Sequence, residues 1–306
     1  MKRLVMITIL LLSFASYWAV NTEAGPAYVR GGNIYVYLPA VVKEPIDIER
    51  EMVLVPAGEF QMGCDETNTT GSCSASQLPL HTVFLDAYRI DKYEITNGQF
   101  ALFMNLRDGD FCSNEPCAAF DGPFDFENIH IVFDNGVYTV EPGFEQVPVG
   151  YVAWHGADAF CRETGGWLPT EAEWEKAARG SEDTRAYPWG DSAPNCSIAN
   201  YAHSVNDNGF CVGNPVPVGN YPAGASPYGA QDMAGNSREW VSDWYDGDYY
   251  ETSPYANPQG PLTGMFKSAR GGYWGSSASG IRVSNRSSQF PTDQGHQFSF
   301  RCAASP

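Results

Sequence analysis

The sequence has few basic residues for its length. Its 306 residues include 18 lysines and arginines against 36 aspartates and glutamates, so the formal net charge is −18 at pH 7. A chain this acidic repels nucleic acids and anionic membrane surfaces, and we expect no nucleic-acid partner. No segment after residue 20 is apolar enough to span a membrane, so we expect no membrane span after removal of a leader.

The one long apolar run lies at the beginning of the chain. Lys2 and Arg3 precede an apolar segment at residues 4–20, and small residues follow. A charged start, an apolar middle and a small-residue end are typical of a secretory signal peptide. We predict a signal peptide at residues 1–24 and a secreted or cell-envelope location, with an uncleaved membrane anchor as the alternative.

The remaining sequence has the composition of a loop-rich globular protein. Aromatic residues make up 14% of the chain, charged residues 18%, and glycine contributes 31 residues. Most breaks between patterned segments contain Gly, Pro, Asn or Asp, so irregular structure should predominate. We expect a linker or N-terminal extension at residues 25–50, with a short strand at 34–42, and one domain at residues 51–306. A further strand is expected at residues 81–91, with burial candidates Val83, Leu85 and Tyr88.

Helix signals are sparse but specific. The pairs Thr96–Gln99 and Thr170–Glu173 have the spacing of capping boxes, in which each side chain binds the other residue's backbone amide. They predict a short helix after Thr96 and a second helix at residues 171–179, which ends at a glycine. A third helix is expected at residues 156–164.

Oxygen-bearing side chains are concentrated at residues 228–244. This stretch reads Y-G-A-Q-D-M-A-G-N-S-R-E-W-V-S-D-W and includes Asp232, Asn236, Glu239 and Asp243. Such a mixture suits a hard cation, because Ca²⁺ takes about six to eight oxygen ligands, often including backbone carbonyls. The alternative is an acidic turn that leads into an amphipathic strand, and no EF-hand pattern is present. The residues alone leave both interpretations open.

Several segments, taken together, are similar to one enzyme family. They are, in chain order, M-V-L-V-P-A-G-E-F-Q-M-G from Met52, I-D-K-Y-E-I-T-N-G-Q-F from Ile90, V-P-V-G-Y-V-A-W-H-G-A-D-A-F-C from Val147, G-W-L-P-T-E-A-E-W-E-K-A-A-R-G ending at Gly180, Y-P-W-G from Tyr187, residues 228–244, A-R-G-G-Y-W from Ala269 and F-R-C-A-A from Phe300. The chain resembles the formylglycine-generating enzyme (sulfatase-modifying factor) family. The resemblance implies an α/β (α+β), C-type-lectin-like fold with short helices, antiparallel strands and variable C-terminal loops.

The eight cysteines all lie beyond the expected signal peptide, and an even number in an exported chain indicates four disulfides. The absence of C-x-x-C pairs makes a zinc site the weaker alternative. The resemblance implies a Cys161–Cys302 bridge, because family members bridge these positions. Local spacing then suggests three further pairs, Cys64–Cys73, Cys112–Cys117 and Cys196–Cys211.

The resemblance also implies two structural calcium sites. The first would use the Asn200 side chain, the Tyr201 carbonyl, the Asn208 side chain and the Phe210 carbonyl. The second would use Asp232, the carbonyls of Gly235 and Ser237, and the Glu239 carboxylate. Asn208 stands where the family usually has aspartate, so the first site would lose a formal charge and bind Ca²⁺ more weakly.

The segment after Arg270 lacks the residues that carry the family's oxidation chemistry. Active members have two cysteines there that hold Cu(I), a metal for which soft sulfur ligands are selective. Here no cysteine lies between Cys211 and Cys302, and Ser276, Ser277 and Ser279 fill the loop. We therefore assign no catalytic residue and expect no bound copper.

Two other chemistries have little support in the sequence. The iron-dependent sulfoxide synthases that share this domain use an H-x-x-x-H-x-E motif, and the five histidines here have no such spacing. A serine nucleophile near His296 lacks a G-x-S-x-G elbow.

The first hypothesis is an exported, monomeric, calcium-stabilised binding module without copper oxidase activity. It would hold a peptide, protein or glycan in a groove lined by Trp274, Arg282, Asn285 and Arg286. The alternative is an enzyme in the same groove, including a formylglycine-generating oxidase with unanticipated ligands.

Overall fold

The computed structural model divides the chain into two units, residues 1–44 and 45–306. It describes residues 27–31, 34–38, 44–68, 73–107, 111–112, 115–119, 129–204 and 209–306, with the backbone alone described at 27–31, 34–38 and 111. In the first unit, β1 (Ala27–Gly31) and β2 (Ile34–Leu38) form an antiparallel hairpin. The predicted signal peptide lies outside the described residues. No helix in the described ranges is both long and apolar enough to cross a membrane.

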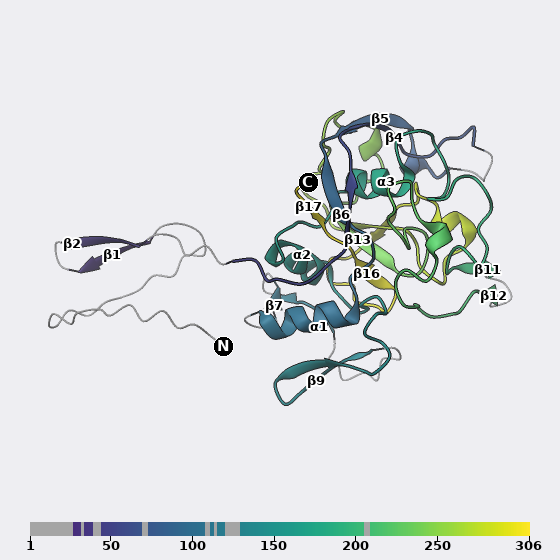
Figure 1. Ribbon diagram of the computed structural model, residues 1–306. Helices are drawn as coiled ribbons and strands as arrows, with labels where there is room; N and C mark the ends of the chain where they lie inside the picture. Colours follow the sequence, from purple (N-terminus) through teal and green to yellow (C-terminus); the bar gives the residue numbers. More distant parts are fainter. Residues whose placement is uncertain are drawn as a thin grey trace. The chain divides into compact units, whose positions relative to one another are not determined.

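The second unit combines short helices with short strands (Figure 1). In the described part, the α-helices are α1 (Asn97–Leu106), α2 (Trp154–Glu163) and α3 (Glu171–Arg179), and the 3-10 turns are η1 (Ala75–Gln77), η2 (Pro222–Gly224), η3 (Tyr249–Glu251) and η4 (Ala278–Ile281). The strands are β3 (Met52–Val55), β4 (Gly58–Met62), β5 (His81–Leu85), β6 (Tyr88–Asp91), β7 (Phe111–Cys112), β8 (Glu115–Pro116), β9 (Ile131–Asp134), β10 (Val137–Val140), β11 (Ala202–Ser204), β12 (Gly209–Phe210), β13 (Arg238–Trp244), β14 (Lys267–Arg270), β15 (Ser287–Gln289), β16 (Phe298–Phe300) and β17 (Ala303–Ala304).

Both capping boxes are present. The Thr96 hydroxyl accepts a hydrogen bond from the Gln99 amide at the start of α1, and the Thr170 hydroxyl accepts one from the Glu173 amide at the start of α3. The helix expected at residues 156–164 instead begins at Trp154. Its N-cap, Ala153, has no side-chain cap, so no local signal marks where this helix starts.

The strand predicted at residues 81–91 is wrong as a single element. It divides into β5 and β6, which belong to different sheets. Between them, the Asp86 amide and carboxylate both hydrogen-bond the side chain of Asn257, which lies 171 residues away along the chain. The predicted burial of Val83, Leu85 and Tyr88 is confirmed, because each is at most 2% exposed.

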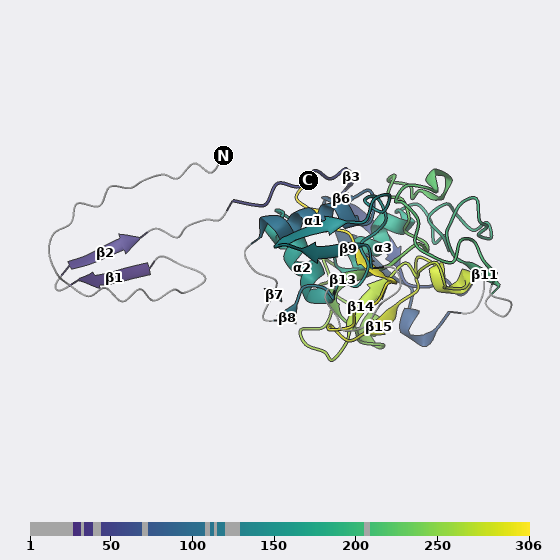
Figure 2. The same ribbon diagram turned by 90° about the horizontal axis from the view of Figure 1, so that it is seen from below.

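The largest sheet of the described residues has the strand order β15–β14–β13–β16, and Figure 2 shows β15, β14 and β13 next to one another. Its β13–β14 and β14–β15 pairs are antiparallel, whereas β13 and β16 run parallel. A second sheet has the order β17–β6–β3, so the end of the chain pairs with a strand near its beginning. The C-terminal segment therefore contributes to both sheets and places β13 at the centre of the unit.

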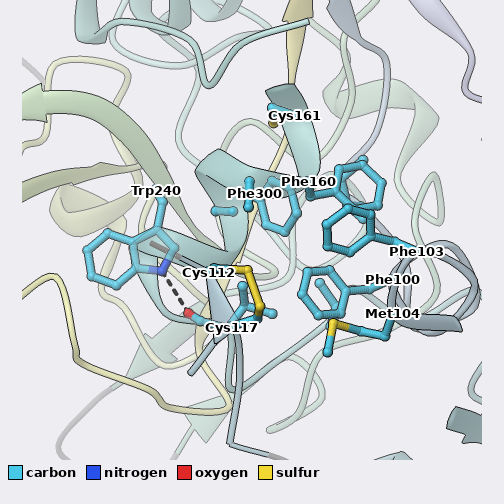
Figure 3. Close-up of a cluster of buried hydrophobic side chains, with 14 of the residues drawn as sticks. Phe100, Phe103, Met104, Cys112, Cys117, Phe160, Cys161, Trp240 and Phe300 are labelled. Carbon is cyan, nitrogen blue, oxygen red and sulfur yellow. Dashed lines mark hydrogen bonds between the residues drawn. A yellow bond between two sulfur atoms is a disulfide. The ribbon is translucent and has the colours of Figure 1, made fainter. Parts of the chain in front are cut away.

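A cluster of aromatic side chains fills the main core (Figure 3). The Phe160 ring of α2 lies 5.0 Å from Phe103 of α1 and 5.3 Å from Phe300 of β16. Trp240 of β13 is fully buried, and its indole nitrogen donates to the Val152 carbonyl. Each such ring contributes about 2–3 kcal/mol by burial. Four disulfides connect the expected pairs, Cys64–Cys73, Cys112–Cys117, Cys161–Cys302 and Cys196–Cys211.

Candidate ligand-binding and metal sites

The oxygen-rich stretch at residues 228–244 turns sharply and then enters β13. Asp232 and Asn236 both adopt φ of 59°, a left-handed conformation that short polar side chains tolerate. Asp232 Oδ2 accepts a hydrogen bond of 2.6 Å from the Gly219 amide. Burial raises the pKa of Asp232 from 3.8 to about 6, so this carboxyl is easily protonated.

Glu239 belongs to the second expected calcium set, and both of its carboxylate oxygens already have strong partners. Arg301 donates to them from Nε and Nη2, each at 2.7 Å, and the Trp174 indole donates to Oε2 at 2.7 Å. Arg301 and Glu239 are both fully buried. This arrangement is a closed internal ion pair, and it leaves little capacity on Glu239 for a cation.

Two further buried carboxyls surround this ion pair. Burial, together with the negative charges of Asp232 and Glu239, raises the pKa of Glu94 well above its usual range. The Glu94 carboxyl accepts hydrogen bonds from the Asn236 side chain at 2.7 Å and from the Ser237 amide at 2.8 Å. Arg301 is thus the positive charge that several buried acidic groups share. The Asp232 and Glu239 carboxyls of the second expected calcium set both accept hydrogen bonds from groups within the protein.

The first expected set contains an oxygen that fits a cation. Asn200 is 1% exposed, and its Oδ1 is buried without a hydrogen-bond partner. Its Nδ2 donates to the Asn214 carbonyl at 2.9 Å, which fixes the orientation of the amide. The Tyr201 carbonyl accepts the Cys211 amide, and Asn208 lies outside the described residues. In the part of the chain that is described, no group of three His, Cys, Asp or Glu residues is placed to hold a metal, so calcium remains a prediction.

Residues 275–281, here called the serine loop, contain no metal-binding sulfur. The Ser276 hydroxyl accepts a hydrogen bond from the Tyr273 amide at 3.1 Å, and the Ser277 and Ser279 hydroxyls lie 3.0 Å apart. The Tyr187 hydroxyl donates to the Ala278 carbonyl at 3.2 Å. All eight cysteines form disulfides, so the chain offers no free thiol. The hydroxyls of this loop bind one another and the backbone.

The expected groove residue Arg286 is largely buried and has internal partners. Its Nε donates to Glu171 at 2.9 Å, and its Nη1 donates to the Ser76 carbonyl at 2.7 Å. The guanidinium also lies 4.2 Å from the centroid of the Tyr250 ring. These contacts leave Arg286 7% exposed and tie it to α3 and η1, and its place in a ligand groove remains a prediction.

Two of the other three expected groove residues, Arg282 and Asn285, lie next to the serine loop, and the Asn285 amide donates to the Arg282 carbonyl at 3.0 Å. Arg282 is buried and hydrogen-bonds the Tyr187 hydroxyl. The Asn285 side chain donates to the Gly280 carbonyl at 2.9 Å and supports the serine loop from beneath. Trp274 is partly exposed, and its ring stacks on His296 at 5.6 Å. Of the four, Trp274 is therefore the best placed to meet a ligand.

Sequence reasoning missed a residue beside Trp274, namely Arg238 at the start of β13. Its guanidinium lies 5.2 Å from the centroid of the Tyr273 ring, and the Tyr273 and Trp274 rings are 5.5 Å apart, edge to face. Arg238 is the only basic residue within residues 228–244. That isolated positive charge in an acidic stretch was the signal that could have found it.

Comparisons with known proteins agree with this fold. The family model for the sulfatase-modifying factor enzyme 1-like domain matches residues 39–306. A formylglycine-generating enzyme of Streptomyces coelicolor is 32% identical over 302 residues, covering 87% of this chain and 94% of that enzyme. The chain belongs to the formylglycine-generating enzyme (sulfatase-modifying factor) family.

Two other similarities carry less information about function. Serine/threonine-protein kinase pkn1 of Chlamydia pneumoniae is 34% identical over 271 residues, which are 88% of this chain and 40% of the kinase. The chain thus spans about two fifths of the length of the chlamydial kinases it matches. The structure of PvdO from Pseudomonas aeruginosa superposes with a TM-score of 0.61 at 23% identity, covering 87% of this chain and 100% of that one. The expected C-type-lectin-like α+β fold is confirmed.

Proposed function

We propose that this protein is a member of the formylglycine-generating enzyme family without copper oxidase activity, and that it binds a peptide or another ligand beside its serine loop. The observation that carries the proposal is the absence of any free thiol: all eight cysteines are in disulfides, and none lies between Cys211 and Cys302. A neutral hydroxyl is a poor ligand for Cu(I), which selects soft sulfur. The fold would then present the partly exposed Trp274 and the residues around it as a binding surface.

Two further properties belong to the same proposal. Four disulfides are consistent with a location outside the cytoplasm, where such bonds persist. Calcium binding at Asn200 would satisfy a buried carbonyl oxygen that has no partner in the described structure. We propose an exported module whose long loops are stabilised by a structural cation.

The alternative is a formylglycine-generating oxidase, and the 32% identity to the Streptomyces coelicolor enzyme favours it. In that case a sulfatase cysteine would be oxidised to formylglycine by a site with different ligands. Nothing in the serine loop supplies such ligands, because its hydroxyls are engaged with each other and with the Tyr273 amide.

The test is a copper titration combined with an oxidation assay. The whole chain would be titrated with Cu(I) against a chelating competitor without thiol reductant, so that the disulfides stay closed and create no adventitious sulfur ligands. It would then be incubated in air with a peptide that contains C-x-P-x-R, beside the Streptomyces coelicolor enzyme as positive control. We expect no stoichiometric copper and no aldehyde by mass spectrometry. One tightly bound copper with aldehyde product would establish the alternative.

A further inference from the structure

Arg238 has no acidic partner among the described residues. Eight other arginines in the described ranges form ion pairs with aspartate or glutamate, namely Arg50, Arg107, Arg162, Arg179, Arg185, Arg270, Arg286 and Arg301. The Nε atom of Arg238 is buried without a hydrogen-bond partner, as is that of the ion-paired Arg179 and Arg270, so the missing carboxylate is what distinguishes Arg238 from them. In a chain with a net charge of −18, a partly buried cation left unpaired is unexpected.

Aromatic rings hold this guanidinium in place. It lies 5.2 Å from the centroid of the Tyr273 ring and 5.8 Å from that of Phe298. Burial lowers the pKa of Arg238, and the only titratable group that opposes this shift is the Tyr273 phenol. An arginine nevertheless keeps its charge at neutral pH. The side chain is therefore charged, oriented and partly exposed, and no carboxylate in the described ranges pairs with it.

Arg286 shows what a neutralised arginine looks like in the same protein. It also stacks on an aromatic ring, 4.2 Å from the centroid of Tyr250, but Glu171 pairs with it at 2.9 Å. Arg238 has the aromatic support without the carboxylate. No carboxylate of the described residues takes the place that Glu171 has beside Arg286, and an anionic group of a ligand would complete the arrangement.

The described residues next to Arg238 add aromatic area but no second charge. Trp274 contacts Tyr273 edge to face at 5.5 Å and stacks on His296 at 5.6 Å. Burial lowers the pKa of His296 from 6.5, which keeps this imidazole neutral at pH 7. The Trp274 indole nitrogen is buried without a hydrogen-bond partner. One positive charge beside two aromatic rings matches a group that carries one negative charge on an apolar stem.

We propose that Arg238 binds a carboxylate of a peptide ligand, an inference that rests on the proposed binding function of the same surface. A carboxylate matches the single charge and can accept two parallel hydrogen bonds from a guanidinium. A phosphate ester, with a charge near −2, would leave negative charge uncompensated beside one arginine. The carboxylate is that of an aspartate or glutamate side chain or of the peptide's C-terminus.

The experiment selects peptides with the whole chain as target. One random peptide library is joined to its carrier through the peptide C-terminus, so only side-chain carboxylates are available. A second library is joined through the N-terminus and presents a free C-terminal carboxylate. The targets are the wild type, Arg238→Gln, Arg238→Lys and Arg89→Gln. Arg89 is exposed and forms no ion pair in the described part, so its substitution controls for the loss of one positive charge elsewhere.

Peptides selected by the wild type are then synthesised in pairs, with the carboxylate intact or replaced by its amide. We expect the amide to bind the wild type and Arg89→Gln about ten- to a hundredfold more weakly, as for a charge-assisted hydrogen bond. Arg238→Gln should bind both members equally and weakly, and Arg238→Lys should keep part of the preference. The library that yields these peptides identifies the source of the carboxylate.

Different failures overturn different statements. Selected peptides that bind equally well as carboxylate and amide would overturn the role of Arg238 and leave the binding function standing. No selection by the wild type from either library would overturn both. If Arg238→Gln does not fold, the carboxylate–amide comparison on the wild type and Arg238→Lys still decides, because the lysine keeps the charge.

Discussion

The buried carboxyl of Asp243 should make the stability of this protein depend on pH. Asp243 is 4% exposed, and burial together with the neighbouring Glu171 raises its pKa from 3.8 to about 7. Between these two values the folded protein keeps a proton that the unfolded chain has released. Such a group stabilises the fold at low pH, and its contribution is lost as the pH rises through about 7.

Burial and the negative charge of Glu171 raise the pKa of Asp243, and the other groups that face it lower the pKa. Its Oδ2 accepts hydrogen bonds from the Glu171 amide at 2.8 Å and from the Ser242 hydroxyl at 3.2 Å, and both favour the ionised carboxylate. Arg286 also lowers the pKa, but it is paired with Glu171. Lys267 also interacts with Asp243 electrostatically without forming an ion pair with any described residue. Burial therefore outweighs the cations.

The perturbation is Asp243→Asn, because an amide has the shape of the protonated carboxyl and cannot ionise. For a pKa of about 7 in the fold and 3.8 in the unfolded chain, the wild type loses about 3 kcal/mol between pH 5 and pH 8. That corresponds to a fall in Tm of about 6–12 °C for a chain of this size. Asp232, whose pKa is raised to about 6, adds a smaller loss of the same sign.

The assay is thermal unfolding of the wild type, Asp243→Asn and the control Asp248→Asn, followed by tryptophan fluorescence from pH 5 to pH 8. Asp248 is exposed, so its substitution should leave the pH dependence unchanged. We expect the fall in Tm to be smaller in Asp243→Asn than in the wild type by about 6–12 °C, and the fall that remains to come from Asp232 and Glu94, whose pKa values are also raised. A wild-type Tm that is constant or rises over this range would refute the reasoning, as would a variant that falls as steeply as the wild type.

Two further predictions follow from the disulfides and from Asn200. The Cys161–Cys302 bridge spans 141 residues and the Cys112–Cys117 bridge spans 5. Replacing both cysteines of a bridge by serine should therefore lower the free energy of unfolding, measured with denaturant, by about 5 kcal/mol for the first bridge and about 2 kcal/mol for the second. Equal losses would contradict the loop-entropy argument. Calcium, but not magnesium, should raise the Tm of the wild type. The variant Asn200→Asp should have a lower Tm than the wild type in EDTA, yet bind Ca²⁺ several-fold more tightly. The control is Asn220→Asp, at an exposed position. Calcium affinity that is identical in all three proteins would place the cation elsewhere.

The features that the sequence predicted well depend on local contacts. Thr96 and Thr170 cap helices through residues three positions away, so their spacing is enough to place the start of each helix. The break between β5 and β6 depends on Asn257, which is 171 residues from Asp86. Alternation of side chains cannot reveal such a partner.

The residues of the candidate site likewise divide into those whose role the local sequence reveals and those whose role depends on a distant partner. The loss of the cysteine pair was visible directly in the sequence. The burial of Arg286 was not, because its carboxylate partner, Glu171, lies 115 residues earlier at the start of α3. Arg238 was missed for the converse reason, since the absence of an acidic partner in the described ranges becomes visible only when the neighbours of a partly buried arginine are known.

The contacts that hold the serine loop explain how the fold can persist without the family's cysteines. Arg270, at the end of β14, pairs with the buried Glu175 of α3 and donates to the Val283 carbonyl at 3.0 Å and to the Asn285 carbonyl at 3.0 Å. The chain is thereby fixed immediately before and shortly after residues 275–281, by groups that make no use of the loop's own side chains. Substitutions at Ser277 and Ser279, whose hydroxyls lie against each other and are partly exposed, then change the loop's chemistry at little cost to folding. Membership of the family, which the fold and the match over residues 39–306 establish, therefore says little about oxidase activity; that depends on the few side chains displayed between the two fixed points.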